Sequence, residues 1–251
     1  MDFSALKQKS PPRLVRACLR SRPKIQFAEA EAMLVARAVR QFRACRFLVF
    51  GVGNDSAMWQ GINSSGATVF LEHNPEWIEK IRQQDGPLDI RRVEYTTRIT
   101  QWREWLDAPR RARLELPCDI REGAWDVVLV DAPNGFAMVE EYPGFGTIHG
   151  RMQSIEAASL LVAPGGFVFV HDAQREVEAA CCDRLLKRDG RLLFRFLMEK
   201  NNGKRTEMRC YFFPGPTSGL TWQARWLQLL AWWLGVWRIP DSQERVRAAS
   251  L

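Results

Sequence analysis

Residues 47–56 read Phe47-Leu48-Val49-Phe50-Gly51-Val52-Gly53-Asn54-Asp55-Ser56. Four consecutive apolar side chains predict a buried strand, and the two glycines after it predict a tight turn. A helix is expected to follow from about Ser56 to Ile62. This strand, turn and helix begin a βαβ unit, in which a glycine backbone lets a ligand approach closely. The turn lacks the third glycine of the dinucleotide fingerprint, which disfavours pyrophosphate binding.

Strands and helices alternate along the chain beyond this stretch. Apolar runs predict strands at 68–71, 89–95, 125–130 and 167–170, and helical spacing predicts helices over 27–45 and around 77–81. Fully apolar strands that alternate with helices indicate a parallel sheet covered on both faces. Residues 192–199 and 206–213 flank an Asn-Asn-Gly-Lys turn, which predicts an antiparallel hairpin. The fold class is therefore α/β, and the element order resembles the class I methyltransferase variation on the Rossmann-like sheet, mostly parallel with a C-terminal antiparallel hairpin and helices on both faces.

The positive charge of the chain is concentrated at its N-terminus. The net charge is +7, but residues 1–46 hold eleven basic and three acidic side chains, so the other 205 residues carry about −1. A near-neutral body argues against a long nucleic-acid groove, and we expect no nucleic-acid partner. We divide the chain into a basic N-terminal arm (1–26), a main domain (27–215) and a tryptophan-rich C-terminal helix and tail (216–251). The arm is expected either to be a solvated helix and tail or to contact phosphate or anionic lipid.

The C-terminal segment holds five of the ten tryptophans between residues 222 and 237. Its apolar stretch is too short to cross a bilayer, so the alternatives are a helix docked on the body, a dimer contact or an interfacial membrane helix. The six cysteines show no CxxC spacing, and no signal-peptide pattern is found, so neither a disulfide framework nor a zinc cluster is expected. We expect a cytoplasmic protein, with peripheral contact at the inner face of the membrane as an option.

Cofactor-binding candidates follow the first two strands of the predicted sheet, because ligands bind beyond the carboxyl ends of parallel strands. The turn supplies Gly51, Gly53, Asn54 and Ser56, although a Gly-x-Gly by itself is also a simple strand-to-helix connection. Glu72 ends the second strand, where its carboxylate is placed to accept hydrogen bonds from both ribose hydroxyls of an adenosyl group. A solvent-facing side chain at the strand end is the alternative for this residue.

Catalytic candidates follow the next two strong strands. Asp131 comes directly after residues 125–130 and is a candidate general base, cofactor or metal ligand, or turn cap. His171 and Asp172 end the neighbouring strand, and a His-Asp pair beside another aspartate favours acid–base chemistry over a purely structural histidine.

Three further residues are candidates for binding the substrate. Arg151 and Arg175 lie at the expected starts of two helices, and the planar guanidinium fork of either one suits the carboxylate of an acidic substrate. Each is equally well explained as a surface ion-pair partner. Asn134, in the loop after Asp131, joins them as a substrate-binding candidate.

Five ordered motifs resemble those of the plant glucuronoxylan 4-O-methyltransferases, a polysaccharide-biosynthesis family. The motifs are residues 47–59, Val69–Glu72 with Trp77-Ile78, residues 125–135, Gly150–Met152, and residues 169–172 with Arg175-Glu176. The resemblance implies transfer of a methyl group from S-adenosylmethionine to the 4-hydroxyl of a glucuronic acid in a glycan or glycoside. It implies a cofactor role for Gly51, Gly53 and Glu72, an active site of Asp131, Arg151, His171 and Asp172, and a divalent metal on Asp131 and Asp172.

The chain departs from that family's pattern at several points. Asn54 and Phe136 replace a typical His and Tyr, no Golgi-type anchor precedes the motifs, and the tryptophan-rich end has no counterpart. We therefore expect a non-plant or unanchored relative. The alternatives are a methyltransferase of a small hydroxylated or nitrogenous metabolite, a non-catalytic scaffold of the same fold, and, last, a nicotinamide oxidoreductase.

Overall fold

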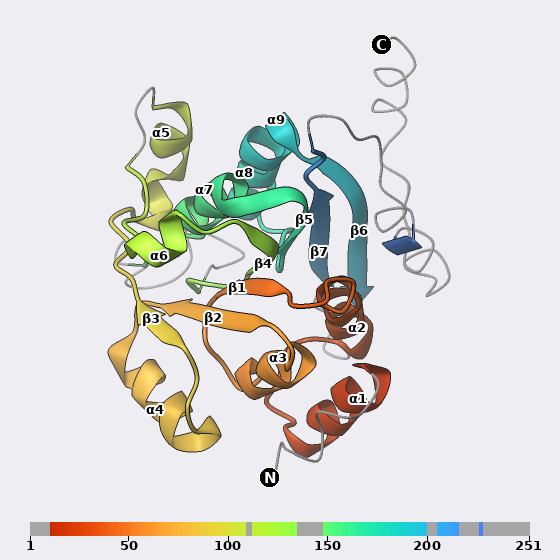
Figure 1. Cartoon of the computed structure of the whole chain (residues 1–251). Helices are drawn as coiled ribbons and strands as arrows, with labels where there is room; N and C mark the ends of the chain where they lie inside the picture. Colours follow the sequence, from red (N-terminus) through yellow and green to blue (C-terminus); the bar gives the residue numbers. More distant parts are fainter. Residues whose placement is uncertain (1–10, 109–111, 135–147, 200–204, 216–225, 228–251) are drawn as a thin grey trace.

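The computed structural model describes residues 11–108, 112–134, 148–199, 205–215 and 226–227. Within them a seven-stranded sheet has the order β3-β2-β1-β4-β5-β7-β6 (Figure 1). The strands are β1 (Arg46–Phe50), β2 (Ala67–Glu72), β3 (Ile90–Arg92), β4 (Trp125–Val130), β5 (Val162–Val170), β6 (Arg191–Glu199) and β7 (Arg205–Phe212). The first five are parallel, and β7 is antiparallel to both β5 and β6. The predicted α/β fold and its C-terminal hairpin are confirmed.

Helices cover both faces of the sheet, as Figure 1 shows, with α1 to α4 on one side and α5 to α9 on the other. They are α1 (Pro11–Ser21), α2 (Glu29–Val39), α3 (Ser56–Ile62), α4 (Pro75–Asp85), α5 (Trp102–Asp107), α6 (Cys118–Arg121), α7 (Met152–Leu161), α8 (Glu176–Cys181) and α9 (Lys187–Asp189). A 3₁₀ turn (Ile99–Gln101) precedes α5, and a π-helical turn (Cys182–Leu186) joins α8 to α9.

The central strands alternate their side chains between two apolar layers. Phe47 and Val49 pack into the layer under α1 to α4, whereas Leu48 and Phe50 pack into the opposite layer. Because side chains of a strand point to opposite faces in turn, a strand with a layer on each side must be apolar throughout. This explains why the run at 47–50 contains no polar residue.

Element boundaries differ from the sequence-based expectation in three places. The helix expected over 27–45 is α2, Glu29–Val39, because the chain uses residues 40–45 to turn into β1. The strand expected over 89–95 is only Ile90–Arg92, and the one expected at 167–170 begins at Val162. The turn of the hairpin, residues 201–204, lies outside the described residues.

Part of the basic arm is packed on the domain. Helix α1 buries Leu14, Val15 and Cys18 in the core while Arg16 and Arg20 stay exposed. The basic residues of α1 therefore form the outer face of an amphipathic helix, and residues 11–21 are not a solvated tail.

The structure describes two residues of the tryptophan-rich segment, Trp226 and Leu227. Leu227 is buried in the core, and the Arg37 guanidinium lies 5.5 Å from the centre of the half-exposed Trp226 ring. The rest of that segment lies outside the described residues. In the part of the chain that the structure describes, no helix has the length and apolar character needed to cross a membrane. The six cysteines are free, and all but Cys118 are buried.

Candidate active site

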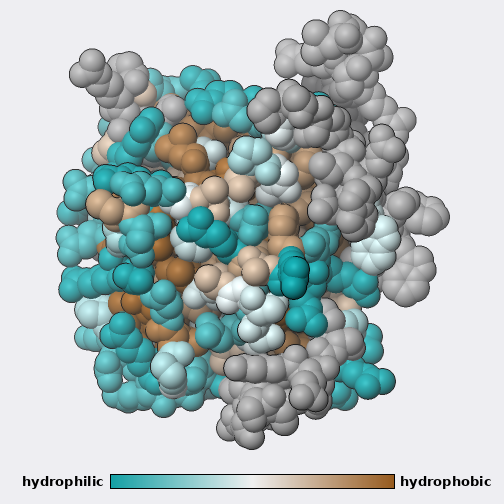
Figure 2. Space-filling model, viewed as in Figure 1, coloured by the Kyte–Doolittle hydropathy of each residue, from teal (hydrophilic) through white to brown (hydrophobic). Residues whose placement is uncertain are grey.

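A cavity of about 610 Å³ opens beyond the carboxyl ends of β1, β2 and β4. This size is typical of a site for a small molecule or cofactor. It is lined by Lys24, Ile25, Gln26, Phe27, Val49, Gly51, Val52, Gly53, Asn54, Asp55, Glu72, His73, Asn74, Trp77, Asp131, Ala132, Pro133, Asn134, Ile148 and His149. Figure 2 shows the described surface around the molecule as largely hydrophilic, with apolar residues gathered nearer the middle of this view. The edge of the sheet predicted to bind a ligand is therefore the edge at which the cavity lies.

Gly51 allows the turn after β1 to lie against the loop after β4. Its φ is +112°, and a Cβ added there would lie 2.9 Å from the Cβ of Ala132. Any other residue would both strain the backbone and push these loops apart. The glycine predicted to admit a ligand is thus also needed for the close contact of two chain segments that line the cavity.

Glu72 lies on the cavity wall with its carboxylate held by backbone amides. Oε1 accepts hydrogen bonds from the N–H groups of His73 (2.8 Å) and Asn74 (2.9 Å), and Oε2 accepts one from Val52 (3.2 Å). Burial raises the pKa of Glu72, but these bonds and His73 outweigh it and hold the pKa below its usual range. Glu72 is therefore ionised at neutral pH, and Oε2 keeps one lone pair for a further donor.

The remaining residues of the turn divide into two groups. Asn54 lines the cavity, and its carbonyl oxygen accepts a hydrogen bond from Arg22 (3.1 Å). Ser56 is buried, does not line the cavity and accepts a hydrogen bond from the Gly53 N–H (2.8 Å). The expectation of direct cofactor binding by Ser56 is not supported, because its hydroxyl already holds the turn together.

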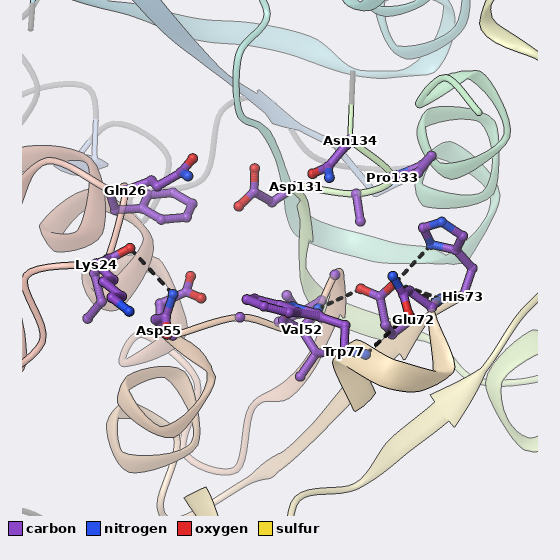
Figure 3. A pocket seen from close by; sticks show the side chains of 18 of the residues that line it. Lys24, Gln26, Val52, Asp55, Glu72, His73, Trp77, Asp131, Pro133 and Asn134 are labelled. Atoms are coloured by element: carbon purple, nitrogen blue, oxygen red, sulfur yellow. Dashed lines mark hydrogen bonds and ion pairs between the residues drawn. The ribbon is translucent and has the colours of Figure 1, made fainter. Parts of the chain in front are cut away.

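Trp77, from the first turn of α4, forms another part of this wall. Its indole N–H donates a hydrogen bond to the carbonyl of Val52, which fixes the ring beside Glu72 (Figure 3). Asn74 caps α4 by accepting hydrogen bonds from Glu76 (3.0 Å) and Trp77 (3.2 Å). The cap explains why the helix begins where it does and why Trp77 faces the cavity.

Asp131 projects into the cavity from the end of β4 and is 29% exposed. Its Oδ1 lies 3.1 Å from the Arg151 guanidinium and 3.0 Å from Nδ1 of His171. Burial raises the pKa of Asp131, but the charges of His171 and Arg151 outweigh it and lower the pKa. The structure thus brings together Asp131, Arg151, His171 and Asp172, which the sequence spreads over 42 positions.

His171 lies behind Asp131 and does not line the cavity. Its side chain is 2% exposed, its ring stacks on Phe27 at 4.4 Å, and its Nε2 lies 3.7 Å from a buried carboxylate oxygen of Glu31. Burial lowers the pKa of His171, but Asp131 outweighs it and raises the pKa to about 10. His171 is therefore protonated at neutral pH, which argues against its expected role as a general base.

Arg151 is a structural residue in this arrangement and does not line the cavity, contrary to the expected substrate role. It is 3% exposed and directly precedes α7, close to the helix start that its position predicted. Its Nε donates to the Pro133 carbonyl (3.0 Å) and its Nη1 to the His171 carbonyl (2.6 Å), while Nη2 donates to Asp131. All three nitrogens of the guanidinium therefore donate hydrogen bonds to acceptors within the protein.

Arg175 also lies away from the cavity. It precedes α8, as expected, and its Nη2 lies 2.6 Å from Asp172. Asp172, whose φ is +57°, has a pKa of about 2, because burial raises the pKa but the charges of His171, Arg151 and Arg175 outweigh it. Asn134 is the one substrate-binding candidate of the three that lines the cavity.

A divalent metal does not fit the pair Asp131 and Asp172 in this arrangement. Possible donor atoms of these residues and of His171 lie within 4.8 Å of one another, which is close enough for them to bind one metal ion together. The carboxylate oxygens nearest this point are already paired with Arg151, Arg175 and protonated His171. A cation placed there would face three positive charges, so the metal site implied by the resemblance is not supported.

Several cavity residues were missed by sequence reasoning. Lys24 and Gln26 reach the site from the segment between α1 and α2, and no local pattern assigns that segment to a sheet edge. Asp55 did carry a signal, because it stands two residues after the Gly-x-Gly and four residues before Trp59, a spacing at which side chains meet on a helix.

Comparison with known proteins places this geometry in a family. The family model IRX15/IRX15L/GXM matches residues 30–114 and 110–193. Glucuronoxylan 4-O-methyltransferase 1 of Arabidopsis thaliana is 32% identical over 211 residues, which are 73% of this chain and 72% of that protein. Arabinogalactan O-methyltransferase 2 of the same plant is 30% identical over 189 residues, 65% of this chain and 62% of that protein.

Among solved structures, the N-methyltransferase NodS from Bradyrhizobium japonicum WM9 in complex with S-adenosyl-L-homocysteine matches with a TM-score of 0.45 and 12% identity. The match covers 82% of this chain and 98% of that one. The family match includes β1, β2 and β4 with Glu72 and Asp131 on the cavity wall, and Arg151 and His171 behind it. It does not include residues 24–27, which also line the cavity. On the strength of the family model and of the first relative, the chain belongs to the IRX15/IRX15L/GXM family.

Proposed function

We propose that the chain is an S-adenosylmethionine-dependent O-methyltransferase that acts on a glycan hydroxyl, preferentially the 4-hydroxyl of a glucuronic acid residue. The observation that carries the proposal is the ionised Glu72 on the wall of a 610 Å³ cavity at the carboxyl ends of β1, β2 and β4. The names of the relatives, which are methyltransferases of glucuronoxylan and arabinogalactan, support the reaction and the glycan acceptor.

The residues around Glu72 fit an adenosyl group. Glu72 Oε2 has one acceptor position left for a ribose hydroxyl, Trp77 supplies an aromatic wall, and Gly51 and Gly53 let the backbone come close. When bound, S-adenosylmethionine supplies a methyl group activated on a sulfonium. The chain's own task is to hold the acceptor oxygen in line with that group and to exclude water.

Lys24 is our candidate for the carboxylate of the acceptor, in place of Arg151 and Arg175. It is the only Lys or Arg among the described residues that line the cavity. Figure 3 shows Lys24 and Gln26 at the end of the cavity that lies away from Glu72 and His73. A cation at that end favours an acidic sugar over a neutral one through a charge-assisted contact.

Asp131 contributes a fixed negative charge at the same edge of the sheet. Arg151 and His171 keep it ionised and fix its orientation, so Asp131 is arranged to position polar groups rather than to exchange protons near neutrality. Asp131 and Asp172, the two carboxylates implied as metal ligands, are already paired with cations.

The test uses the purified full chain. Calorimetric titration with S-adenosylhomocysteine measures cofactor binding, and labelled methyl transfer is then compared on glucuronoxylan fragments, arabinogalactan fragments and a neutral xylo-oligosaccharide. We expect binding, transfer to the glucuronoxylan fragments and little transfer to the neutral sugar. A chain that binds no S-adenosylhomocysteine would refute the reaction, and equal transfer to the neutral sugar would refute the acidic acceptor.

A matched pair of variants tests Lys24. Lys24→Met should raise KM severalfold for the acidic acceptor and leave S-adenosylhomocysteine binding unchanged. Arg13→Met removes the same charge from the exposed face of α1 and should change neither quantity. If Lys24→Met instead weakens cofactor binding, Lys24 contacts the cofactor and not the acceptor.

A further inference from the structure

Asp55 is a third carboxylate on the cavity wall, besides Glu72 and Asp131, and the proposed function gives it no role. It is the residue before α3, and its Oδ2 accepts a hydrogen bond from the indole N–H of Trp59 (2.7 Å). Figure 3 shows Asp55 and Asp131 at the same end of the cavity, away from Glu72 and His73. Two carboxylates from different elements therefore face the space assigned above to the acceptor.

These two carboxylates have different surroundings. Asp131 has two cationic partners, Arg151 and His171, at hydrogen-bonding distance. Asp55 has a neutral indole donor and no Lys, Arg or His within 4.0 Å among the described residues of the structure. Burial, and then the charge of Asp131, raise the pKa of Asp55 to about 6, while the Trp59 hydrogen bond and the more distant His171 oppose the rise.

The other charged groups near Asp55 come from the segment before α2 and from α2 itself. The segment before α2 provides Lys24 on the cavity wall and Arg22, which bonds the Asn54 carbonyl and pairs with Asp85 at 2.5 Å. Glu31 of α2 lies against His171, behind the Phe27 ring. Each of these cations except Lys24 already has an anionic partner, so Asp55 is the carboxylate least compensated by positive charge.

We propose that Asp55 is the general base of methyl transfer: its carboxylate accepts the proton of the acceptor hydroxyl as that oxygen attacks the methyl carbon. This inference rests on the proposed function and assigns a residue that the sequence reasoning left without a role. Two titratable groups in one active site can have different pKa values because their surroundings differ. The group with the lower pKa then stays charged, and the other exchanges the proton. Asp131 is the first and Asp55 the second.

The step balances without a further reactant. The acceptor O–H bond breaks and its proton passes to Asp55, the oxygen forms a bond with the methyl carbon, and the carbon–sulfur bond breaks. The electron pair of that bond stays on sulfur, which becomes a neutral thioether. The proton on Asp55 then returns to solvent through the open cavity.

The main test is Asp55→Asn, with Asp119→Asn as an exposed control that removes the same charge on α6. Single-turnover methyl transfer is measured from pH 5 to 9, and S-adenosylhomocysteine binding is measured separately. In the unaltered chain the rate should rise with pH through about 6 and then level. Asp55→Asn should bind S-adenosylhomocysteine normally, transfer methyl roughly 10²- to 10⁴-fold more slowly and lose the rise near pH 6.

A second variant keeps the proposal testable even if Asp55→Asn does not fold. Trp59→Phe removes the indole donor that stabilises the ionised carboxylate, so the rise in rate should move to higher pH. An unmoved profile in this variant would overturn the proposal.

Two results with Asp55→Asn would also overturn the assignment. A rate within severalfold of the unaltered chain would show that Asp55 is not the base, and lost S-adenosylhomocysteine binding would show that it contacts the cofactor. Absence of binding and transfer in the unaltered chain would refute the proposed function instead.

Discussion

Replacing Arg151 by Met should unfold the site rather than change its substrate. The side chain is 3% exposed, and its fork bonds the Pro133 carbonyl, the His171 carbonyl and Asp131. Removing one partner of a buried ion pair costs about 3–5 kcal/mol, because the other charge is left without compensation. For a chain of this size that loss corresponds to a fall in Tm of roughly 6–20 °C.

The assay is thermal unfolding followed by circular dichroism, with two comparison variants. Arg188→Met removes an exposed pair with Asp189, at 60% and 52% exposure, and should cost under about 1 kcal/mol. Arg151→Lys keeps the charge but replaces a planar fork by one ammonium, so its Tm should fall between those of the unaltered chain and Arg151→Met.

A normal Tm for Arg151→Met would refute this reasoning. If that variant also lost transfer to acidic acceptors alone, Arg151 would be the substrate-binding residue that its sequence position suggests. A large fall in Tm without selective loss of the acidic acceptor supports the structural role.

Two further predictions concern Glu72 at the end of β2 and His171 directly after β5. The Glu72 carboxylate accepts hydrogen bonds from three backbone N–H groups, and Glu72→Gln replaces one of its oxygens by an N–H donor. S-adenosylhomocysteine should then bind roughly 10- to 150-fold more weakly in calorimetry. Unchanged affinity would show that Glu72 does not bind the cofactor. The pKa of His171 is about 10 in the folded chain against 6.5 as its ordinary value, so its stabilising effect is fully present below pH 6.5 and is lost as pH rises toward 10. His171→Gln should therefore flatten the dependence of unfolding free energy on pH between 6.5 and 10, measured by urea denaturation, and an unchanged slope would contradict the pairing with Asp131.

The strands and the edge of the sheet where ligands bind were open to prediction from the sequence. A strand buried on both faces must be apolar at every position, so the apolar runs at 47–50 and 127–130 predict strands from local composition alone. Glu72, Asp131 and His171 follow such strands directly, and the parallel arrangement brings the ends of those strands to one edge. The extra strand residues at 162–166 lacked this signal, because they include a proline and two glycines.

The roles of the charged residues required the tertiary structure. Arg151, Arg175 and Lys24 are all cations in the sequence. In the structure Arg151 is buried against Asp131 and the partly buried Arg175 pairs with Asp172, whereas the segment before α2 brings Lys24 to the cavity. Likewise, the residue type alone makes His171 a candidate proton acceptor. In the folded chain Asp131 and Glu31 lie beside it and make it a protonated ion-pair partner. Local composition determines which residues form strands, because a strand covered on both faces needs an apolar side chain at each of its own positions. The charge state and availability of Arg151 and His171 depend on partners 20 and 140 positions away, so only the folded chain decides them.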